Sequence, residues 1–154
     1  MSDAPHIMVV ESRCHEDIAD ELVRGALGEL NKAGATHHRV PVPGVLEIPA
    51  AVQIAVRSMD VYTARRRYDG YVALGCVIRG ETTAYDLICS RAMHGLHDLV
   101  LRHTLAVGTG ILTVENREQA WVRAAVGGRN RGGQAARACL DMIELKRQFR
   151  LYPR

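Results

Sequence analysis

Short apolar runs and longer amphipathic segments alternate along most of the chain. The apolar runs predict strands, and the segments with apolar side chains on one face predict helices. With right-handed crossovers, this alternation predicts an α/β fold, a flavodoxin-like three-layer sandwich around a four-stranded parallel sheet. Residues 1–154 show no repeat and no linker, so we expect a single domain. The strands are expected at residues 6–12, 36–42, 71–78 and 105–114, and the helices at residues 16–33, 50–59, 85–103, 117–125 and 134–149.

A polar turn follows the third predicted strand, where residues 79–83 read Arg-Gly-Glu-Thr-Thr. Thr82 or Thr83 is expected to cap the next helix. The carboxyl end of a strand in an open parallel sheet is a common ligand site, and the free N–H groups of a helix start attract anions. The turn therefore predicts a small anionic ligand. A glycine-rich stretch at residues 126–133 predicts another turn.

The charge of the chain excludes little, but it indicates what kind of partner to expect. The formal net charge is only +3, and the basic clusters at residues 65–67 and 146–154 are expected to be solvated surface. We therefore expect no nucleic-acid partner, whereas a small molecule carrying phosphate suits a mildly basic protein. The sequence has no signal-peptide pattern and no apolar stretch near the roughly 20 residues that span a bilayer. The expected location is the cytoplasm, with no membrane partner.

The cysteines argue against a metal site. Cys14, Cys76, Cys89 and Cys139 form no CxxC pair, and no set of cysteines and histidines has the spacing of zinc ligands. We expect the four thiols to behave as small buried apolar groups in a reducing compartment.

Four motifs in order carry a resemblance to a known family. They are Val-Pro-Gly-Val-Leu-Glu-Ile-Pro at residues 42–49, Leu-Gly-Cys-Val-Ile-Arg-Gly-Glu-Thr at 74–82, Gly-Ile-Leu-Thr-Val-Glu-Asn-Arg-Glu-Gln-Ala at 110–120, and Asn-Arg-Gly at 130–132. Together they resemble the lumazine synthases, and the resemblance extends over residues 6–149. It implies condensation of 5-amino-6-(D-ribitylamino)uracil with 3,4-dihydroxy-2-butanone 4-phosphate to 6,7-dimethyl-8-ribityllumazine, in riboflavin biosynthesis. It also implies no metal or organic cofactor.

The resemblance assigns residues to the two substrates. Inorganic phosphate, or the phosphate of the substrate, is implied to meet Glu81, Thr82 and Arg123, with Arg131 standing where the family usually has lysine. Read without the motif, Arg123 is an exposed helix charge. The ribityl chain is implied to lie against Val45, Leu46 and Glu47, and the pyrimidine against Cys76, Val77 and Ile78. For Glu47, a carboxylate that caps the following helix is an equally good interpretation.

Three positions depart from the family pattern. Ala84 stands where the family has the histidine that transfers protons, and Cys14 stands where it has an aromatic residue that stacks on the pyrimidine. Thr109 occupies a third site position that is usually aromatic or polar. Loss of a general acid or base typically lowers a rate 10²–10⁴-fold. His15 follows Cys14, and whether it replaces either group stays open.

The departures leave three functions open. The chain can be a slow lumazine synthase, a catalytically silent oligomeric scaffold (a paralogue or an engineered variant), or a pentamer that binds flavin or lumazine. The resemblance implies a homopentamer with active sites between subunits, and in some members an assembly of pentamers into a shell. The helix at residues 85–103 supports a homo-oligomer, because its apolar residues extend beyond one stripe.

Overall fold

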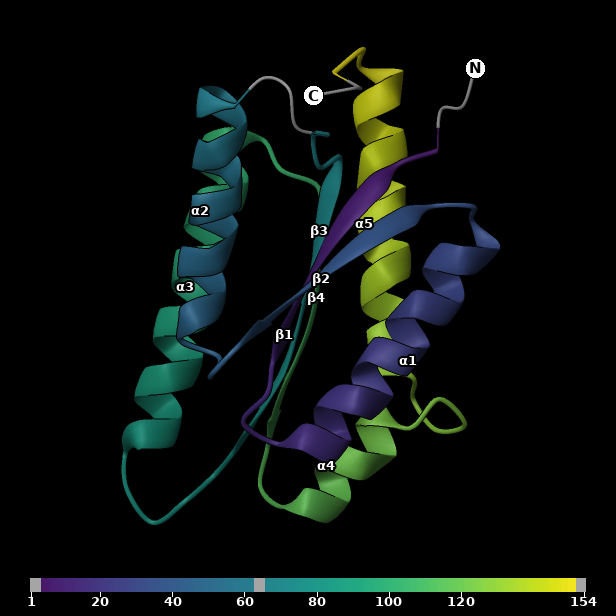
Figure 1. Cartoon of the computed structure of the whole chain (residues 1–154). Coiled ribbons are helices and arrows are strands. Elements are labelled where there is room, and N and C mark those ends of the chain that lie inside the picture. The colour runs from purple at the N-terminus through teal and green to yellow at the C-terminus, as the bar shows by residue number, and fades with distance from the viewer. Residues whose placement is uncertain (1–3, 63–65, 152–154) are drawn as a thin grey trace.

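The computed structural model describes residues 4–62 and 66–151. In this part of the chain, four strands and five helices follow one another in the expected order, and all neighbouring strands pair in parallel in the order β2-β1-β3-β4 (Figure 1). The predicted α/β fold and four-stranded parallel sheet are therefore confirmed. The elements are β1 His6–Ser12, α1 Glu16–Lys32, β2 Thr36–Val42, α2 Glu47–Val61, β3 Gly70–Ile78, α3 Ala84–His103, β4 Val107–Val114, α4 Arg117–Ala124 and α5 Arg131–Gln148.

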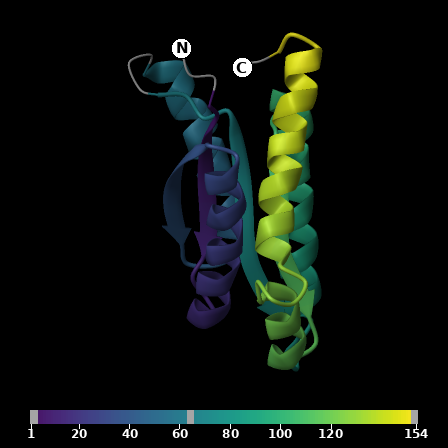
Figure 2. The ribbon, with the colours of Figure 1, turned by 90° about the vertical axis from the view of Figure 1, so that its right-hand side faces the viewer.

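The helices cover both faces of the sheet. Helices α2 and α3 pack on one face, and α1, α4 and α5 pack on the other (Figure 1). Figure 2 shows α1 and α5 side by side on the second face. Each face has its own apolar core, and β3 supplies side chains to both because its residues are buried almost throughout. A strand buried on both faces reads as a continuous apolar run, which is why the sequence predicts β3 well.

Two glycines let helix α5 pack closely against β4 and α1. A Cβ atom added to Gly108 of β4 would lie 1.7 Å from the carbonyl oxygen of Ala135. A Cβ atom added to Gly132 of α5 would lie 2.0 Å from the carbonyl oxygen of Leu22 in α1. Side chains at these two positions would push α5 away from the sheet and from α1.

Two helices begin three residues earlier than the sequence predicts. Helix α2 begins at Glu47 rather than at residue 50. Pro49 falls in the first turn of the helix, where a backbone N–H has no helical partner, so the proline does not interrupt the helix. Helix α5 begins at Arg131 rather than at residue 134. Asn130, in the left-handed conformation with φ 48°, accepts a hydrogen bond from the Gly133 N–H at 3.2 Å. This cap makes Gly132 and Gly133 helical, so the prediction of a turn up to residue 133 is wrong.

Smaller differences concern the surface. Lys146 is buried and its Nζ donates to the Thr104 carbonyl at 2.7 Å, so this residue of the basic tail is not solvated as expected. Cys76 and Cys139 are buried and Cys89 is half-buried, whereas Cys14 is exposed. Arg65 and residues 152–154, which belong to the two basic clusters, lie outside the described residues. Within the described part of the chain, the helices are too short or too polar to cross a bilayer.

Candidate functional site

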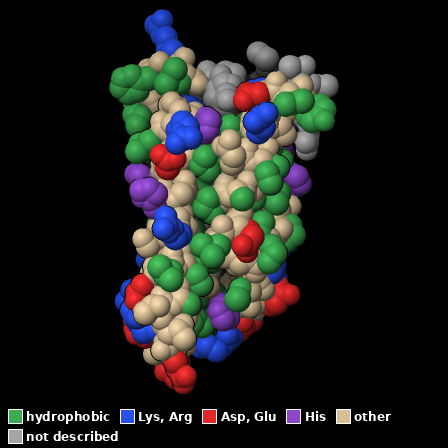
Figure 3. All heavy atoms as spheres, turned by 90° about the vertical axis from the view of Figure 1, so that its left-hand side faces the viewer, with side chains coloured by type: hydrophobic (Ala, Val, Ile, Leu, Met, Phe, Trp, Pro, Cys, Tyr) green, Lys and Arg blue, Asp and Glu red, His purple; other side chains and the backbone are tan. Residues whose placement is uncertain are grey.

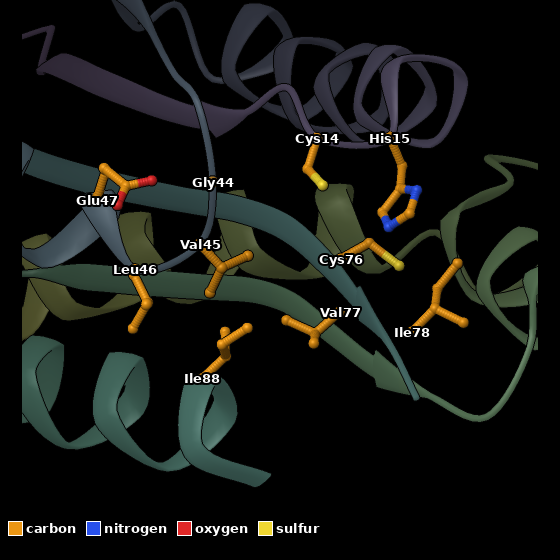
Figure 4. A pocket seen from close by; sticks show the side chains of 10 residues that line it. All are labelled: Cys14, His15, Gly44, Val45, Leu46, Glu47, Cys76, Val77, Ile78 and Ile88. Carbon is orange, nitrogen blue, oxygen red and sulfur yellow. The ribbon is translucent and has the colours of Figure 1, made fainter. Parts of the chain in front are cut away.

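A cavity of about 320 Å³ opens at the carboxyl edge of the sheet (Figure 4). Its walls come from the turn after β1, the segment between β2 and α2, the end of β3 and the start of α3. Open parallel sheets bind ligands at this edge. The lining residues are Cys14, His15, Gly44, Val45, Leu46, Glu47, Cys76, Val77, Ile78 and Ile88.

Local packing explains why these segments meet. Gly75 of β3 lies beneath Val45, and a Cβ atom at Gly75 would come within 2.8 Å of the Val45 Cγ2 atom. The glycine therefore lets the segment before α2 cover the end of β3. Val45 and Ile48 are buried, whereas Leu46 and Glu47 are exposed. The two exposed side chains thus remain free to contact a ligand.

The turn that carries Cys14 and His15 is anchored by a buried carboxylate. The side chain of Glu11 in β1 is only 3% exposed, and it accepts two hydrogen bonds from Arg39 of β2, each at 2.7 Å. Glu11 also accepts a bond from Arg13 at 2.8 Å, and the same guanidinium pairs with two carboxylates of α1. These carboxylates raise the pKa of Arg13, because they stabilise its charged form. Sequence reasoning missed this network, because its members lie on separate elements.

The predicted substrate residues fall into two groups. Seven of them line the cavity together: Cys14, Val45, Leu46, Glu47, Cys76, Val77 and Ile78. In Figure 4, the Glu47 carboxylate lies at the α2 end of the cavity, away from Cys76 and Ile78. Glu47 is also the first residue of α2, where the helix dipole favours a negative charge, so both interpretations of this carboxylate suit its position.

The predicted phosphate turn follows the cavity along β3. Arg79 is held there by Glu115, whose carboxylate accepts bonds from Nε at 3.0 and 3.1 Å and raises the pKa of the guanidinium. The Thr82 hydroxyl accepts a bond from the Ala84 N–H at 3.2 Å, whereas Thr83, the residue before α3, makes no side-chain cap. Glu81 and Thr82 are exposed and do not line the cavity itself.

Four further predicted positions lie outside the cavity lining. Ala84 is exposed at the start of α3, one helical turn before Ile88, so both residues face the same side of the helix. Thr109 lines a separate hollow of about 200 Å³ between β4 and α3. Arg123 of α4 is half-buried and its Nη1 donates to the Gln119 carbonyl at 3.1 Å. Arg131 is the first residue of α5.

Sequence reasoning also missed lining residues. The sequence leaves the role of His15 open and assigns none to Gly44 or Ile88, yet all three line the cavity. The four-residue spacing between Ala84 and Ile88 is the signal that could have identified Ile88. Burial raises the pKa of the Cys76 thiol to about 11, so this lining group is neutral at physiological pH. Residues 4–62 and 66–151 include no cluster of three or more His, Cys, Asp or Glu side chains suited to a metal ion.

Fold and site together define a parallel α/β protein with a small-molecule cavity beside a helix start. The sequence model of 6,7-dimethyl-8-ribityllumazine synthase matches residues 4–147, and the chain belongs to this family. The similar proteins bear the same name. One from Bartonella bacilliformis is 48% identical over 94% of this chain and 92% of its own length. One from Agrobacterium fabrum is 49% identical, covering 94% and 97%. A protein of Rhizobium meliloti named 6,7-dimethyl-8-ribityllumazine synthase 1 is 51% identical, covering 94% and 93%.

Proposed function

We propose that this protein condenses 5-amino-6-(D-ribitylamino)uracil with 3,4-dihydroxy-2-butanone 4-phosphate to form 6,7-dimethyl-8-ribityllumazine in riboflavin biosynthesis. One observation carries the proposal: seven residues that the family resemblance assigns to the substrates line a single cavity. The cavity volume of about 320 Å³ lies at the lower end of the usual range for ligand sites, roughly 300–1,000 Å³.

The chemistry requires the two substrates to be held together. The amine of the uracil attacks the ketone, water leaves, and phosphate departs before the second ring closes. Holding both molecules in one orientation supplies much of the acceleration of such a reaction. We assign the ribityl hydroxyls to the Leu46–Glu47 wall and the pyrimidine to the end of β3. The phosphate group then points toward Glu81 and Thr82, where the free N–H groups of α3 favour an anion.

The site is proposed to be completed by a second copy of the chain. Arg123 and Thr109 lie outside the lining of the cavity in their own subunit, although the resemblance assigns both to the site. A homopentamer in which each cavity receives these residues from a neighbour accounts for their position. Arginine suits the role because its guanidinium can pair with two phosphate oxygens at once.

The proposed enzyme is expected to turn over slowly, because two positions lack the groups that the family uses to transfer protons and to stack on the pyrimidine. Ala84 cannot transfer a proton, and Cys14 offers a thiol in place of an aromatic ring. The same two positions favour a second candidate function, a pentamer that retains the cavity for lumazine or flavin without turnover. Stacking of an aromatic ring on a base is worth roughly 1–3 kcal/mol, so Cys14 should also weaken pyrimidine binding.

A direct assay tests the proposal. The purified protein should form lumazine from the two substrates above the uncatalysed rate, measured by lumazine fluorescence and phosphate release. Ala84→His should raise kcat about tenfold or more, because residue 84 and Ile88 share one face of α3. Ser90→His is the matched control, since it adds an imidazole at an exposed position of α3 outside the cavity. Absence of turnover in both the wild type and Ala84→His would refute the proposed enzymatic activity.

The two silent alternatives make different predictions in the same samples. A scaffold keeps an intact oligomer in native mass spectrometry and shows neither turnover nor ligand binding. A flavin or lumazine binder shows micromolar retention of riboflavin or lumazine without turnover. A flat titration together with turnover excludes both alternatives.

A further inference from the structure

The imidazole of His15 lies on the wall of the cavity and has no structural task that the described contacts reveal. His15 is the residue before α1, with φ −121° and ψ 93°, but its side chain does not cap the helix. Within residues 4–62 and 66–151, its ring has no hydrogen-bond partner and it is half-buried. Figure 4 shows the ring directed from the turn after β1 toward the end of β3, beside Cys76 and Ile78.

Two other ionisable side chains that line the cavity, Cys76 and Glu47, are poorly suited to the proton transfer. The Cys76 thiol holds its proton, because burial raises its pKa to about 11. The Glu47 carboxylate lies at the other end of the cavity in Figure 4, beside the wall assigned to the ribityl chain. Histidine is the residue type whose ordinary charge change falls between pH 5 and 8, so imidazole can both accept and return a proton there.

We propose that His15 is the proton-transfer group of the lumazine-forming reaction, an inference that rests on the function proposed above. Once the uracil amine has condensed with the ketone and one water has left, the imidazole removes a proton from the carbon between the imine and the phosphate-bearing carbon. The electron pair of that C–H bond forms a C=C bond, and the C–O bond to phosphate breaks. Phosphate leaves with the electron pair of the C–O bond, and the imidazolium returns its proton to the departing phosphate.

The turn that carries His15 is fixed well enough to hold an imidazole in place. Glu11, four residues before His15, is buried and accepts hydrogen bonds from Arg39 and Arg13 at 2.7 to 2.8 Å. Arg13 is itself part of the turn that leads to His15. A group held in position before the reaction loses little freedom when the substrate arrives. The turn therefore supplies the orientation that a proton-transfer group needs.

The charges around His15 are largely paired with one another. On α1, Glu16 pairs with Arg13, and Asp17 pairs with Arg117 of α4. From β3, the neighbouring group is the neutral Cys76 thiol. Among the described residues, the carboxylates of α1 next to His15 are thus engaged by arginines, and the imidazole is available to the substrate.

Replacement of the imidazole should affect turnover rather than binding. His15→Gln is expected to lower kcat about a hundredfold while KM changes less than threefold, and the limb of the kcat–pH profile due to histidine should disappear. His15→Gly should be restored in part by added imidazole, since glycine is tolerated before a helix and leaves a space for the ring. His37→Gln, which removes an imidazole of β2 outside the cavity, should match the wild type.

A double variant separates this inference from the proposed function. Ala84→His should raise kcat at least ten times more in the His15→Gln background than in the wild type, because the new imidazole replaces the lost one. Turnover by the wild type that is unchanged in His15→Gln and in His15→Gly, without imidazole rescue, would overturn the role of His15 and leave the function standing. A wild type without turnover would overturn both.

Discussion

Helices α3 and α5 differ in how much of their surface the chain itself covers. Two of the 20 residues of α3 are buried, Ala92 and Leu96, whereas seven of the 18 residues of α5 are buried. Helix α5 is pressed against β4 and α1 at two glycines, but α3 leaves Leu87 and Leu101 60% and 72% exposed. Figure 3 shows apolar side chains scattered over the α2–α3 face. Helix α5 is thus covered more fully by its own subunit than α3, and the proposed oligomer would cover the apolar surface that α3 leaves exposed.

Gly108→Ala should break the α5 side and is expected to have the largest effect. The added Cβ atom would lie 1.7 Å from the Ala135 carbonyl oxygen, and backbone cannot yield as a flexible side chain can. Overpacking of this kind typically costs 1–3 kcal/mol, and we expect about 3 kcal/mol or more from urea denaturation. Gly28→Ala is the matched control, because no atom lies within 4 Å of the added Cβ, and it should stabilise the protein by roughly 0.5–1 kcal/mol. Equal free energies of unfolding for Gly108→Ala and Gly28→Ala would show that the close approach at Gly108 is not needed to hold α5 on the sheet.

Leu87→Lys combined with Leu101→Lys should weaken assembly next most strongly. The two side chains lie fourteen residues apart on one side of α3 and are exposed, so the fold of the subunit should persist. Burying a leucine is worth roughly 1.5–3 kcal/mol, so we expect at least a hundredfold weaker association in native mass spectrometry and light scattering. Met142→Lys combined with Leu145→Lys on α5 makes the same change at side chains 42% and 41% exposed. If the α5 double variant dissociated the oligomer and the α3 double variant did not, the subunit interface would lie on α5 instead of α3.

Arg123→Ala tests whether the two faces meet at the site. Helix α4 lies on the α5 side of the sheet, whereas the phosphate turn leads into α3. Under the proposed function, Arg123 of one subunit reaches the phosphate held at the turn of a neighbouring subunit. Hydrogen bonds to charged groups contribute about 1.5–3 kcal/mol, so phosphate affinity should fall roughly tenfold to a hundredfold in calorimetric titration, with assembly unchanged. Arg129→Ala removes a nearby exposed guanidinium and should leave the affinity as it was. Unchanged affinity in Arg123→Ala would mean that the assignment is wrong.

The sequence predicts what depends on neighbours along the chain and misses what depends on distant contacts. The buried strand β3 and the polar turn after it can be predicted from the sequence, because both depend on residues that are neighbours along the chain. The start of α5 is not, since it depends on the Asn130 cap and on the approach of Gly132 to Leu22. Lys146 is missed for the same reason, because its partner Thr104 lies 42 residues away.

The candidate site divides in the same way. The succession of strand, polar turn and helix predicts an anion near residues 79–83, and the family resemblance adds seven of the residues that line the cavity. His15 could not be placed from the sequence, because the direction of its ring depends on how the turn after β1 is held by Arg39 and Glu11. The side of a turn that a residue faces is a tertiary property, and this chain shows no periodicity there.

The smallest expected effect concerns an ion pair that joins two helices of the α5 face. Arg117 of α4 bonds to Asp17 of α1 and lowers the pKa of that carboxyl, whereas Arg102 pairs with Asp98 inside α3 at 2.8 Å. A lowered carboxyl pKa contributes stability above the usual pKa of 3.8, and this contribution is lost as the pH falls through the folded-state value. The Tm of the wild type should therefore fall more steeply than that of Arg117→Gln between pH 5 and pH 3, and the two should converge at the acid end. Exposed pairs contribute little, so the separation at pH 6 should be small, and Arg102→Gln should separate less still because its pair links no second element. A larger shift from Arg102→Gln would show that α3 depends on its own surface charges more than the α5 face depends on contacts between its helices.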